Sequence, residues 1–160
     1  MRLREITSQD VPAILSLNNA ASPAVPTSTE SELDALLGAS SYGFAAVADD
    51  EVLGFVVGFA PGSDYASPNY RYFEERGTDH LYVDRIVVAE SARGMRIGQA
   101  LYGRVVELAI EQGRSEITCE VNVVPPNPGS MAFHSRMGFS EVARQHTSYA
   151  TVALLARPLS

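Results

Sequence analysis

The sequence predicts an α/β fold: a mixed sheet of six to seven strands with helices on both faces. Two observations carry this prediction. Antiparallel strand candidates come first along the chain, and a strand-helix-strand-helix-strand alternation follows them. At 160 residues and 46% hydrophobic composition, the chain fits one domain with a sizeable core. We therefore expect residues 1–160 to form a single domain.

The first elements are a strand over Leu3–Ile6 and two helices. Ser8 is expected to cap the first helix, which carries apolar residues at helical spacing and ends near Ala21. Thr29 is expected to cap the second helix, which runs to about Leu37 and has glutamates in its first turn. Two prolines between the helices predict a loop.

A hairpin and a long insertion follow. Ser41–Ala48 and Val52–Phe59 are rich in Val and Phe, and the acidic turn between them predicts an antiparallel pair. Pro61–Asp79 is long, polar and aromatic, with a helical turn expected over Asn69–Arg76. Because long insertions in compact domains are often functional, this segment is a candidate substrate lid; an idle surface loop is the alternative.

The second half of the chain alternates strands and helices. A strand over Leu81–Val88 precedes an amphipathic helix that starts after Gly98 and ends near Gly113, and the next strand covers Ser115–Val121. The last expected elements are a short helix and two strands: Ser130–Met137, Ser140–Ala143 and Thr151–Leu155.

The turn between the Leu81–Val88 strand and its helix has the composition of a phosphate-binding loop. Amides at the start of a helix have no intrahelical partner and lie at the positive end of the helix dipole, so a glycine-bearing turn there can bind a pyrophosphate. An ordinary strand-to-helix connection is the alternative. The residues of this turn are Arg93, Gly94, Met95, Arg96, Ile97 and Gly98.

A second segment, Asn127–Phe139, strengthens the ligand-binding interpretation. Together the two segments resemble the GNAT superfamily of N-acetyltransferases, whose first signature is Arg/Gln-x-x-Gly-x-Gly/Ala. The second signature is an Asn followed by a small residue, an aromatic-Tyr pair and Gly-Phe. The positions that match are Arg93, Gly98, Asn127, Ser130, Phe133, Gly138 and Phe139.

Two positions depart from these signatures. Arg96 replaces the middle glycine, which removes a residue permissive for positive φ and adds a cation beside the expected pyrophosphate. His134 replaces the tyrosine that protonates the departing thiolate in many family members. The first change leaves the backbone donors in place. The second puts the identity of the acid in question.

The resemblance implies that acetyl-CoA lies between the fourth and fifth strands. Its pantetheine would pair with the backbone of Ile86, Val87 and Val88, and its pyrophosphate would meet the Arg93–Gly98 amides. Asn127, with Ser130, would hold the pantetheine, and Asn127 would also cap the following helix. An amide near Val87 or Val88 would stabilise the oxyanion.

Acetylation of an amine needs its neutral form, so a base or a water chain is required. Asp84 and Glu120 are the carboxylates nearest the expected cofactor gap, and either could be the base or the anchor for the substrate ammonium. A structural salt bridge is the alternative for each. The resemblance places His134 at the position of the acid, and its imidazole could donate or relay a proton.

Composition narrows the classes of function that remain possible for this chain. The net charge of −7 argues against a nucleic-acid binder. Polar residues interrupt the N-terminal segment and the longest apolar runs are short, so we expect a cytoplasmic protein without a signal peptide or membrane span. Three scattered histidines suggest no metal site, and Cys119 is expected in the core.

The leading hypothesis is an acetyl-CoA-dependent N-acetyltransferase (EC 2.3.1.-) that acts by direct transfer in a ternary complex. Its acceptor would be a primary amine. We favour an amine of a small molecule, and an amine of a peptide or protein is the alternative. An acetyl-CoA- or CoA-binding sensor with little or no catalysis is the alternative. A dinucleotide-binding domain is weaker, because the Gly-x-Gly-x-x-Gly pattern is missing. The resemblance also implies a homodimer through the last strands.

Overall fold

The computed structural model describes residues 1–148 and 150–159; Tyr149 and Ser160 lie outside the described residues. Within the described residues the strands are β1 (Arg2–Glu5), β2 (Tyr42–Ala48), β3 (Glu51–Phe59), β4 (His80–Val88), β5 (Glu116–Val124), β6 (Ser140–His146) and β7 (Thr151–Pro158). The helices are η1 (Ser8–Asp10), α1 (Val11–Ala20), α2 (Glu30–Ala39), α3 (Pro68–Arg76), η2 (Glu90–Ala92), α4 (Ile97–Glu111) and α5 (Pro128–Arg136).

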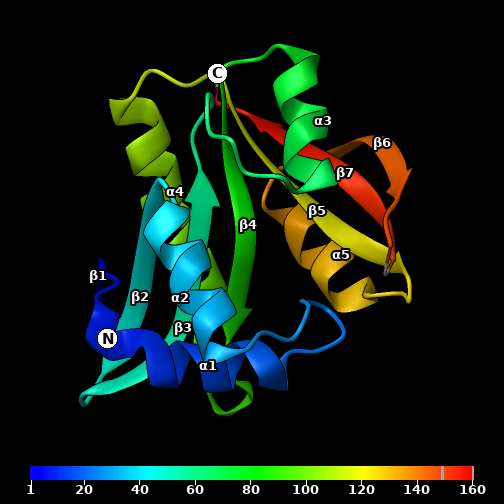
Figure 1. Ribbon diagram of the computed structural model, residues 1–160. Helices are drawn as coiled ribbons and strands as arrows, with labels where there is room; N and C mark the ends of the chain where they lie inside the picture. The colour runs from blue at the N-terminus through cyan, green and yellow to red at the C-terminus, as the bar shows by residue number, and fades with distance from the viewer. Residues whose placement is uncertain (149, 160) are drawn as a thin grey trace. The chain divides into compact units, whose positions relative to one another are not determined.

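The described strands form one mixed sheet in the order β1-β2-β3-β4-β5-β7-β6 (Figure 1). The predicted α/β class and mixed sheet are therefore confirmed. Contacts along the chain divide it into two compact units. The first unit is Met1–Gly58 with Arg85–Val105, and the second is Phe59–Asp84 with Val106–Ser160. Both β4 and α4 pass from one unit into the other.

The first unit contains the predicted hairpin. β1 pairs with β2, and β2 with β3, all antiparallel. The turn residues Asp49 and Asp50 have φ values of 51° and 64°, the left-handed pair that suits a two-residue hairpin turn. In Figure 1, α1 and α2 lie in front of β2 and β3.

One predicted helix cap is confirmed and one is wrong. Thr29 caps α2, because its hydroxyl accepts from the Glu32 amide at 3.1 Å and the Glu32 carboxylate accepts from the Thr29 amide at 2.9 Å. Ser8 does not cap α1; it opens the short helix η1, whose N-cap is Thr7. The N-cap of α1 itself is Asp10, whose carboxylate accepts from the Thr7 amide at 2.8 Å.

Among the described strands of the second unit, β4 and β5 form a parallel pair. β4 pairs with β5 over His80–Tyr82 and Glu116–Thr118, and β5 continues through β7 to the edge strand β6 in antiparallel fashion. Inside this unit the β4–β5 pairing stops at Tyr82 and Thr118, although both strands continue. The strands therefore begin to separate just before Asp84 and Glu120.

The insertion before β4 contains the helical segment that the sequence predicts. It holds α3, a nine-residue helix with a serine N-cap and a glycine after its last residue, where a helical turn was expected over Asn69–Arg76. Tyr70 and Phe73 of this helix are fully buried. Their burial shows that α3 is part of the packing of the second unit and not an idle surface loop. None of the described helices is long and apolar enough to cross a membrane.

Candidate active site

The end of β4 lies beside β3 in the first unit. The Ala89 amide donates to the Leu53 carbonyl at 2.8 Å, and the Val87 carbonyl faces Gly54. Because backbone groups alternate in direction along a strand, those of Ile86 and Val88 point to the opposite edge of β4. Of the three residues predicted to pair with the pantetheine, these two have their backbone on the edge away from β3.

The predicted phosphate loop lies between η2 and α4. Arg93, Gly94, Met95 and Arg96 are all exposed. The amides of Arg93 and Met95 already donate to the carbonyls of Glu90 and Ala92, both at 3.2 Å. The amides of Ile97 and Gly98 belong to the first turn of α4, where no intrahelical acceptor exists. The backbone amides that suit an anion are therefore mainly those at the start of α4, and not those of the whole turn.

Arg96 has a backbone conformation that glycine adopts readily. Its φ is +60°, in the left-handed region, and Gly94 nearby has φ of +87°. A non-glycine residue in this region costs about 1–2 kcal/mol. The turn therefore carries local strain at Arg96.

Gly54 of β3 fixes the start of α4 against the sheet. A Cβ atom at this position would lie 2.9 Å from the Val87 carbonyl oxygen and 3.1 Å from the Cγ2 atom of Ile97. Leu101 of α4 is also in contact range, and both Ile97 and Leu101 are buried. The missing side chain lets α4 approach β3 closely at Gly54.

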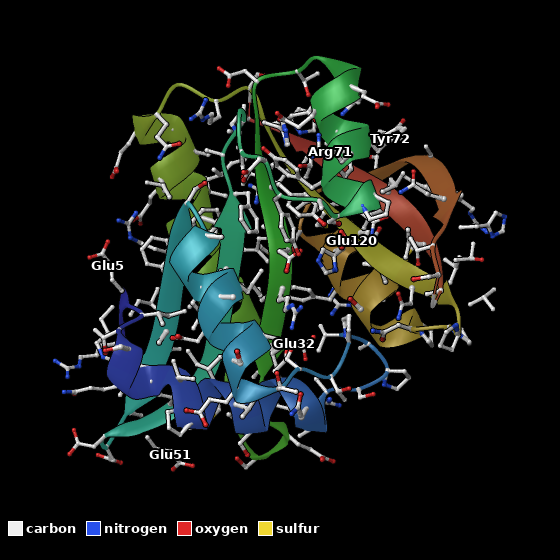
Figure 2. The ribbon with its side chains drawn as sticks, in the orientation of Figure 1. Glu5, Glu32, Glu51, Arg71, Tyr72 and Glu120 are labelled. Carbon is white, nitrogen blue, oxygen red and sulfur yellow. The ribbon has the colours of Figure 1, made fainter. Side chains whose placement is uncertain are left out.

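In the second unit, Asp84 and Glu120 lie on the same face of the sheet. Tyr82 is paired with Thr118 in parallel register, so the next residues of the same parity on each strand, Asp84 and Glu120, point to the same side. This is the side on which His80 contacts Thr118 at 2.9 Å. Alternation alone had left the faces of the two carboxylates undetermined. Figure 2 shows the Glu120 side chain.

Each of these carboxylates accepts a hydrogen bond from a tyrosine. The Tyr65 hydroxyl donates to Asp84 Oδ1 at 2.8 Å. The Tyr82 hydroxyl lies 2.8 Å and 2.7 Å from the two carboxylate oxygens of Glu120. Burial, followed by the charges of Glu120 and Asp84, raises the pKa of Tyr82 well above its usual value. Tyr82 is therefore a hydrogen-bond donor at neutral pH.

The histidine at the position of the family acid is buried in α5. His134 Nδ1 lies 2.8 Å from the Ser130 carbonyl oxygen, which can only accept, so Nδ1 carries the proton. Burial lowers the pKa of His134, and its ring packs edge-on against Phe133 and Phe139. Donation of a proton to a thiolate from Nε2 would therefore need the doubly protonated ring.

Asn127 is the N-cap of α5, as predicted. Its side-chain oxygen accepts from the Ser130 amide at 3.3 Å. The Ser130 hydroxyl in turn lies 3.3 Å from His134 Nδ1. The motif residues Asn127, Ser130 and His134 thus form one connected group that runs from the N-cap of α5 to its last turn.

Sequence reasoning missed Tyr65 and Tyr82. The signal for Tyr82 was present, since it is two residues before Asp84 on the same strand and so shares its face. No pattern in the sequence could have shown that Tyr65, nineteen residues from Asp84, would reach it. That contact depends on the folded path of the insertion.

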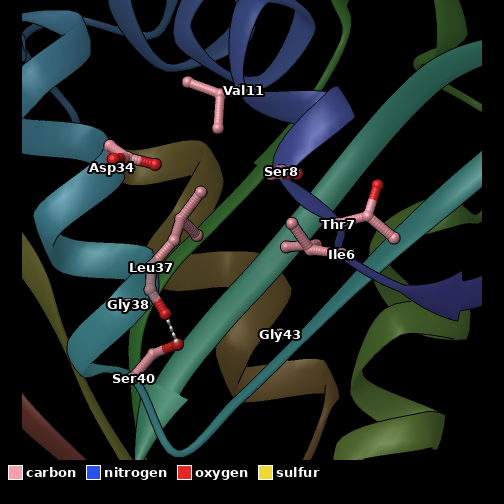
Figure 3. Close-up of a pocket in the computed structure, with 9 residues that line it drawn as sticks. All are labelled: Ile6, Thr7, Ser8, Val11, Asp34, Leu37, Gly38, Ser40 and Gly43. Carbon is pink, nitrogen blue, oxygen red and sulfur yellow. Dashed lines mark hydrogen bonds between the residues drawn. The ribbon is translucent and has the colours of Figure 1, made fainter.

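Other candidate features do not coincide with these residues. A hollow of about 330 Å³ in the first unit is lined by residues between β1 and α1, by α2 and by β2, among them Thr7, Asp34 and Gly43 (Figure 3). None of the predicted site residues lines it. Cys119 is buried, as expected. The part of the chain that the structure describes has no group of three or more His, Cys, Asp or Glu residues suited to a metal ion.

Comparison with known families supports the sequence motifs. The model of the acetyltransferase (GNAT) family matches residues 11–139 of this chain. The match includes β4, the Arg93–Gly98 turn and the Asn127–Phe139 segment.

Solved structures share the fold at low sequence identity. The ribosomal-protein-S18-alanine N-acetyltransferase from Escherichia coli is 15% identical with a TM-score of 0.76, and the match covers 99% of this chain and 94% of that one. An N-acetyltransferase from Staphylococcus aureus Mu50 is 22% identical with a TM-score of 0.75, over 99% and 98% of the chains. The protein yncA from Salmonella typhimurium, solved with its cofactor acetyl-CoA, is 16% identical with a TM-score of 0.74, over 100% and 94%.

Proposed function

Because this chain belongs to the GNAT family of acetyltransferases, we propose that it transfers an acetyl group from acetyl-CoA to a primary amine of a small molecule. The transfer is direct, in a ternary complex of protein, acetyl-CoA and amine. The observation that carries the proposal is the β4–turn–α4 arrangement of the first unit. There, backbone groups at the strand edge and at the helix start are oriented for an extended ligand with an anionic end.

The first unit supplies the residues proposed to bind acetyl-CoA. The backbone of Ile86 and Val88 pairs with the pantetheine, and the first-turn amides of α4 bind the pyrophosphate. Arg93 and Arg96 are exposed on the same turn and add charge-assisted hydrogen bonds. Asn127 and Ser130 are proposed as further cofactor residues because they match the family motif.

The second unit supplies the proposed acid–base groups. One of Asp84 and Glu120 anchors the substrate ammonium, and the other accepts its proton so that the neutral nitrogen can attack the thioester carbonyl. The N–C bond forms, the C–S bond breaks, and CoA leaves as a thiolate that is then protonated. The Val88 amide, on the strand edge away from β3, is the candidate donor to the oxyanion.

His134 remains the candidate donor to the departing thiolate. Because its pKa is lowered, the His134 imidazole is neutral in most molecules at neutral pH. A thiol pKa near 8.5 makes the thiolate a tolerable leaving group, so this donation helps without being essential. The same observation motivates the alternative function, an acetyl-CoA- or CoA-binding protein with little catalysis.

The charges of the acceptor region suggest which amines are preferred. Asp84 and Glu120 share one face, so an ammonium is attracted there and a carboxylate next to the reacting nitrogen is repelled. A like charge about 6 Å away costs roughly 3 kcal/mol at an effective dielectric constant of 20. We therefore expect the acceptor to lack an α-carboxylate.

The experiment is an acetylation assay over matched sets of amines. Each set has an amine, its α-carboxylated counterpart and the corresponding α-carboxamide, for example phenethylamine, phenylalanine and phenylalaninamide. We expect the carboxylated member to have a kcat/KM at least about tenfold lower than the other two. Release of CoA thiol and the mass of the acetylated amine are measured. Tight acetyl-CoA binding without turnover of any amine would favour the CoA-binding alternative.

The proposal extends to the organisation of the chain. Residues 1–160 act as one N-acetyltransferase domain, supported by a family match that includes residues of both units. The protein is proposed to work in the cytoplasm, without nucleic acid as a partner, in line with its net charge of −7. A homodimer through the last strands stays part of the proposal.

A further inference from the structure

The insertion between β3 and β4 brings a tyrosine to one of the candidate carboxylates. Residues 60–67 have no helix or strand, and α3 follows them. All of these residues, together with His80 and Asp84 of β4, belong to the second unit. The sequence marked this insertion as a candidate lid without indicating which residue would act.

The start of the insertion is held in place by α3. The Tyr70 hydroxyl donates to the Ala60 carbonyl at 2.6 Å and accepts from the Ser63 amide at 3.2 Å. The Glu74 carboxylate accepts from the Gly62 amide at 2.9 Å and contacts His80 Nε2 at 2.8 Å. Tyr70 and His80 are fully buried. The backbone just before Tyr65 is therefore fixed at several points.

Tyr65 is fixed through its ring as well as its hydroxyl. Its ring stacks on Phe59, with centroids 4.0 Å apart and planes within 10°. Its hydroxyl donates to Asp84 Oδ1 at 2.8 Å. Because the stacking sets the ring plane, the direction of the hydroxyl is set before any substrate binds.

The Tyr65 hydroxyl matters for Asp84 because other titratable side chains lie around this carboxylate. Glu120 on β5 and Tyr82 on β4 face the same region, and Glu74 of α3 lies further along the face beside His80. A second carboxylate nearby disfavours the ionised form of Asp84, whereas a donated hydrogen bond favours it. Asp84 must be ionised in either proposed role, as ammonium anchor or as proton acceptor.

We propose that Tyr65 is the positioning residue for Asp84: its hydroxyl keeps the carboxylate ionised and correctly oriented for the acceptor amine. This inference rests on the proposed function. It gives the insertion a specific task in the acceptor region, since the insertion delivers the Tyr65 hydroxyl and α3 secures its approach.

The test is Tyr65→Phe, which removes the hydroxyl and keeps the ring on Phe59. The Asp84 carboxylate loses a hydrogen-bond donor that favours its ionised form. As the pH is lowered, the variant should therefore lose activity at a higher pH than the wild type does. We expect the acidic midpoint of the kcat/KM profile to rise by about one pH unit. The loss of activity should be larger at pH 6 than at pH 8, and the melting temperature should change little.

Two controls separate positioning from general disturbance. Tyr72 of α3, labelled in Figure 2, is a partly exposed tyrosine on the same insertion, and Tyr72→Phe should leave the midpoint unchanged. In an Asp84→Asn background, Tyr65→Phe should have no further effect on the pH profile. An unmoved midpoint in Tyr65→Phe, or an equal shift in the Asp84→Asn background, would overturn the inference.

A second readout does not depend on turnover. With aspartate labelled by ¹³C at the carboxyl carbon, the Asp84 resonance can be followed by NMR over pH in the wild type and in Tyr65→Phe. The inference requires a higher titration midpoint in the variant, and equal midpoints would refute it. If the resonance shifts as expected but no amine is acetylated, the proposed function fails while the Tyr65–Asp84 coupling stands.

Discussion

Replacing Glu120 by Gln is expected to lower kcat/KM for the acceptor amine by about 100- to 10 000-fold. Gln keeps the size of the side chain and an oxygen that can accept from Tyr82, but it can neither hold an ammonium by charge nor take its proton. The measurement is steady-state kinetics with the best amine of the matched sets. Affinity for acetyl-CoA should be unchanged, because the cofactor residues proposed in the first unit are untouched.

The comparison with Asp84→Asn assigns the two roles. The variant that loses mainly kcat identifies the proton acceptor, and the variant that mainly raises KM for the amine identifies the anchor. Glu111→Gln is the matched control, since Glu111 is an exposed residue at the end of α4. Full activity in Glu120→Gln would remove Glu120 from the mechanism.

The second large effect concerns the close packing of α4 and of the Val87 carbonyl against Gly54 of β3. Gly54→Ala places a Cβ atom 2.9 Å from the Val87 carbonyl oxygen, so the backbone of β4 or the start of α4 must move. We expect a loss of about 1–3 kcal/mol in the free energy of unfolding. This corresponds to a melting temperature lower by roughly 2–4 °C for each kcal/mol, which differential scanning calorimetry would measure. Affinity for acetyl-CoA should fall as well.

Gly103→Ala is the matched control for this substitution. Gly103 lies in α4, and an added Cβ atom there meets nothing within 4 Å. Alanine in the interior of a helix is favoured over glycine by about 0.5–1 kcal/mol, so this variant should be more stable than the wild type. If the two variants changed stability in the same direction, the close contacts of Gly54 with Val87 and Ile97 would not govern how α4 packs on the sheet.

The elements with strong local signals were predictable from the sequence. The β2–β3 hairpin, the Thr29 cap and the Asn127 cap depend on residues close together in the chain, whose preferences for turns and helix ends are intrinsic. The alternation of β4, α4, β5 and α5 along the chain predicted the fold class in the same way. The Ser8 cap was wrong because Ser8 lies inside the short helix η1, whose N-cap is Thr7, and α1 begins after Asp10.

The acceptor region was predictable only in part. Asp84 and Glu120 could be placed on neighbouring strands, but their common face depends on the β4–β5 register, which a single sequence does not specify. Tyr65 reaches Asp84 only because buried residues of α3 hold the insertion, a long-range effect invisible in local patterns. The positive φ of Arg96 was likewise not predictable, since arginine rarely adopts it.

The most direct test of the account is the thermal stability of the purified protein with acetyl-CoA, CoA, NAD or ATP. Each ligand is added at about a hundredfold excess over a plausible dissociation constant, where binding contributes about 2.7 kcal/mol. The account predicts that acetyl-CoA and CoA raise the melting temperature by several degrees and that NAD and ATP do not. No shift with acetyl-CoA or CoA would contradict the assignment of the β4–turn–α4 arrangement as the cofactor site.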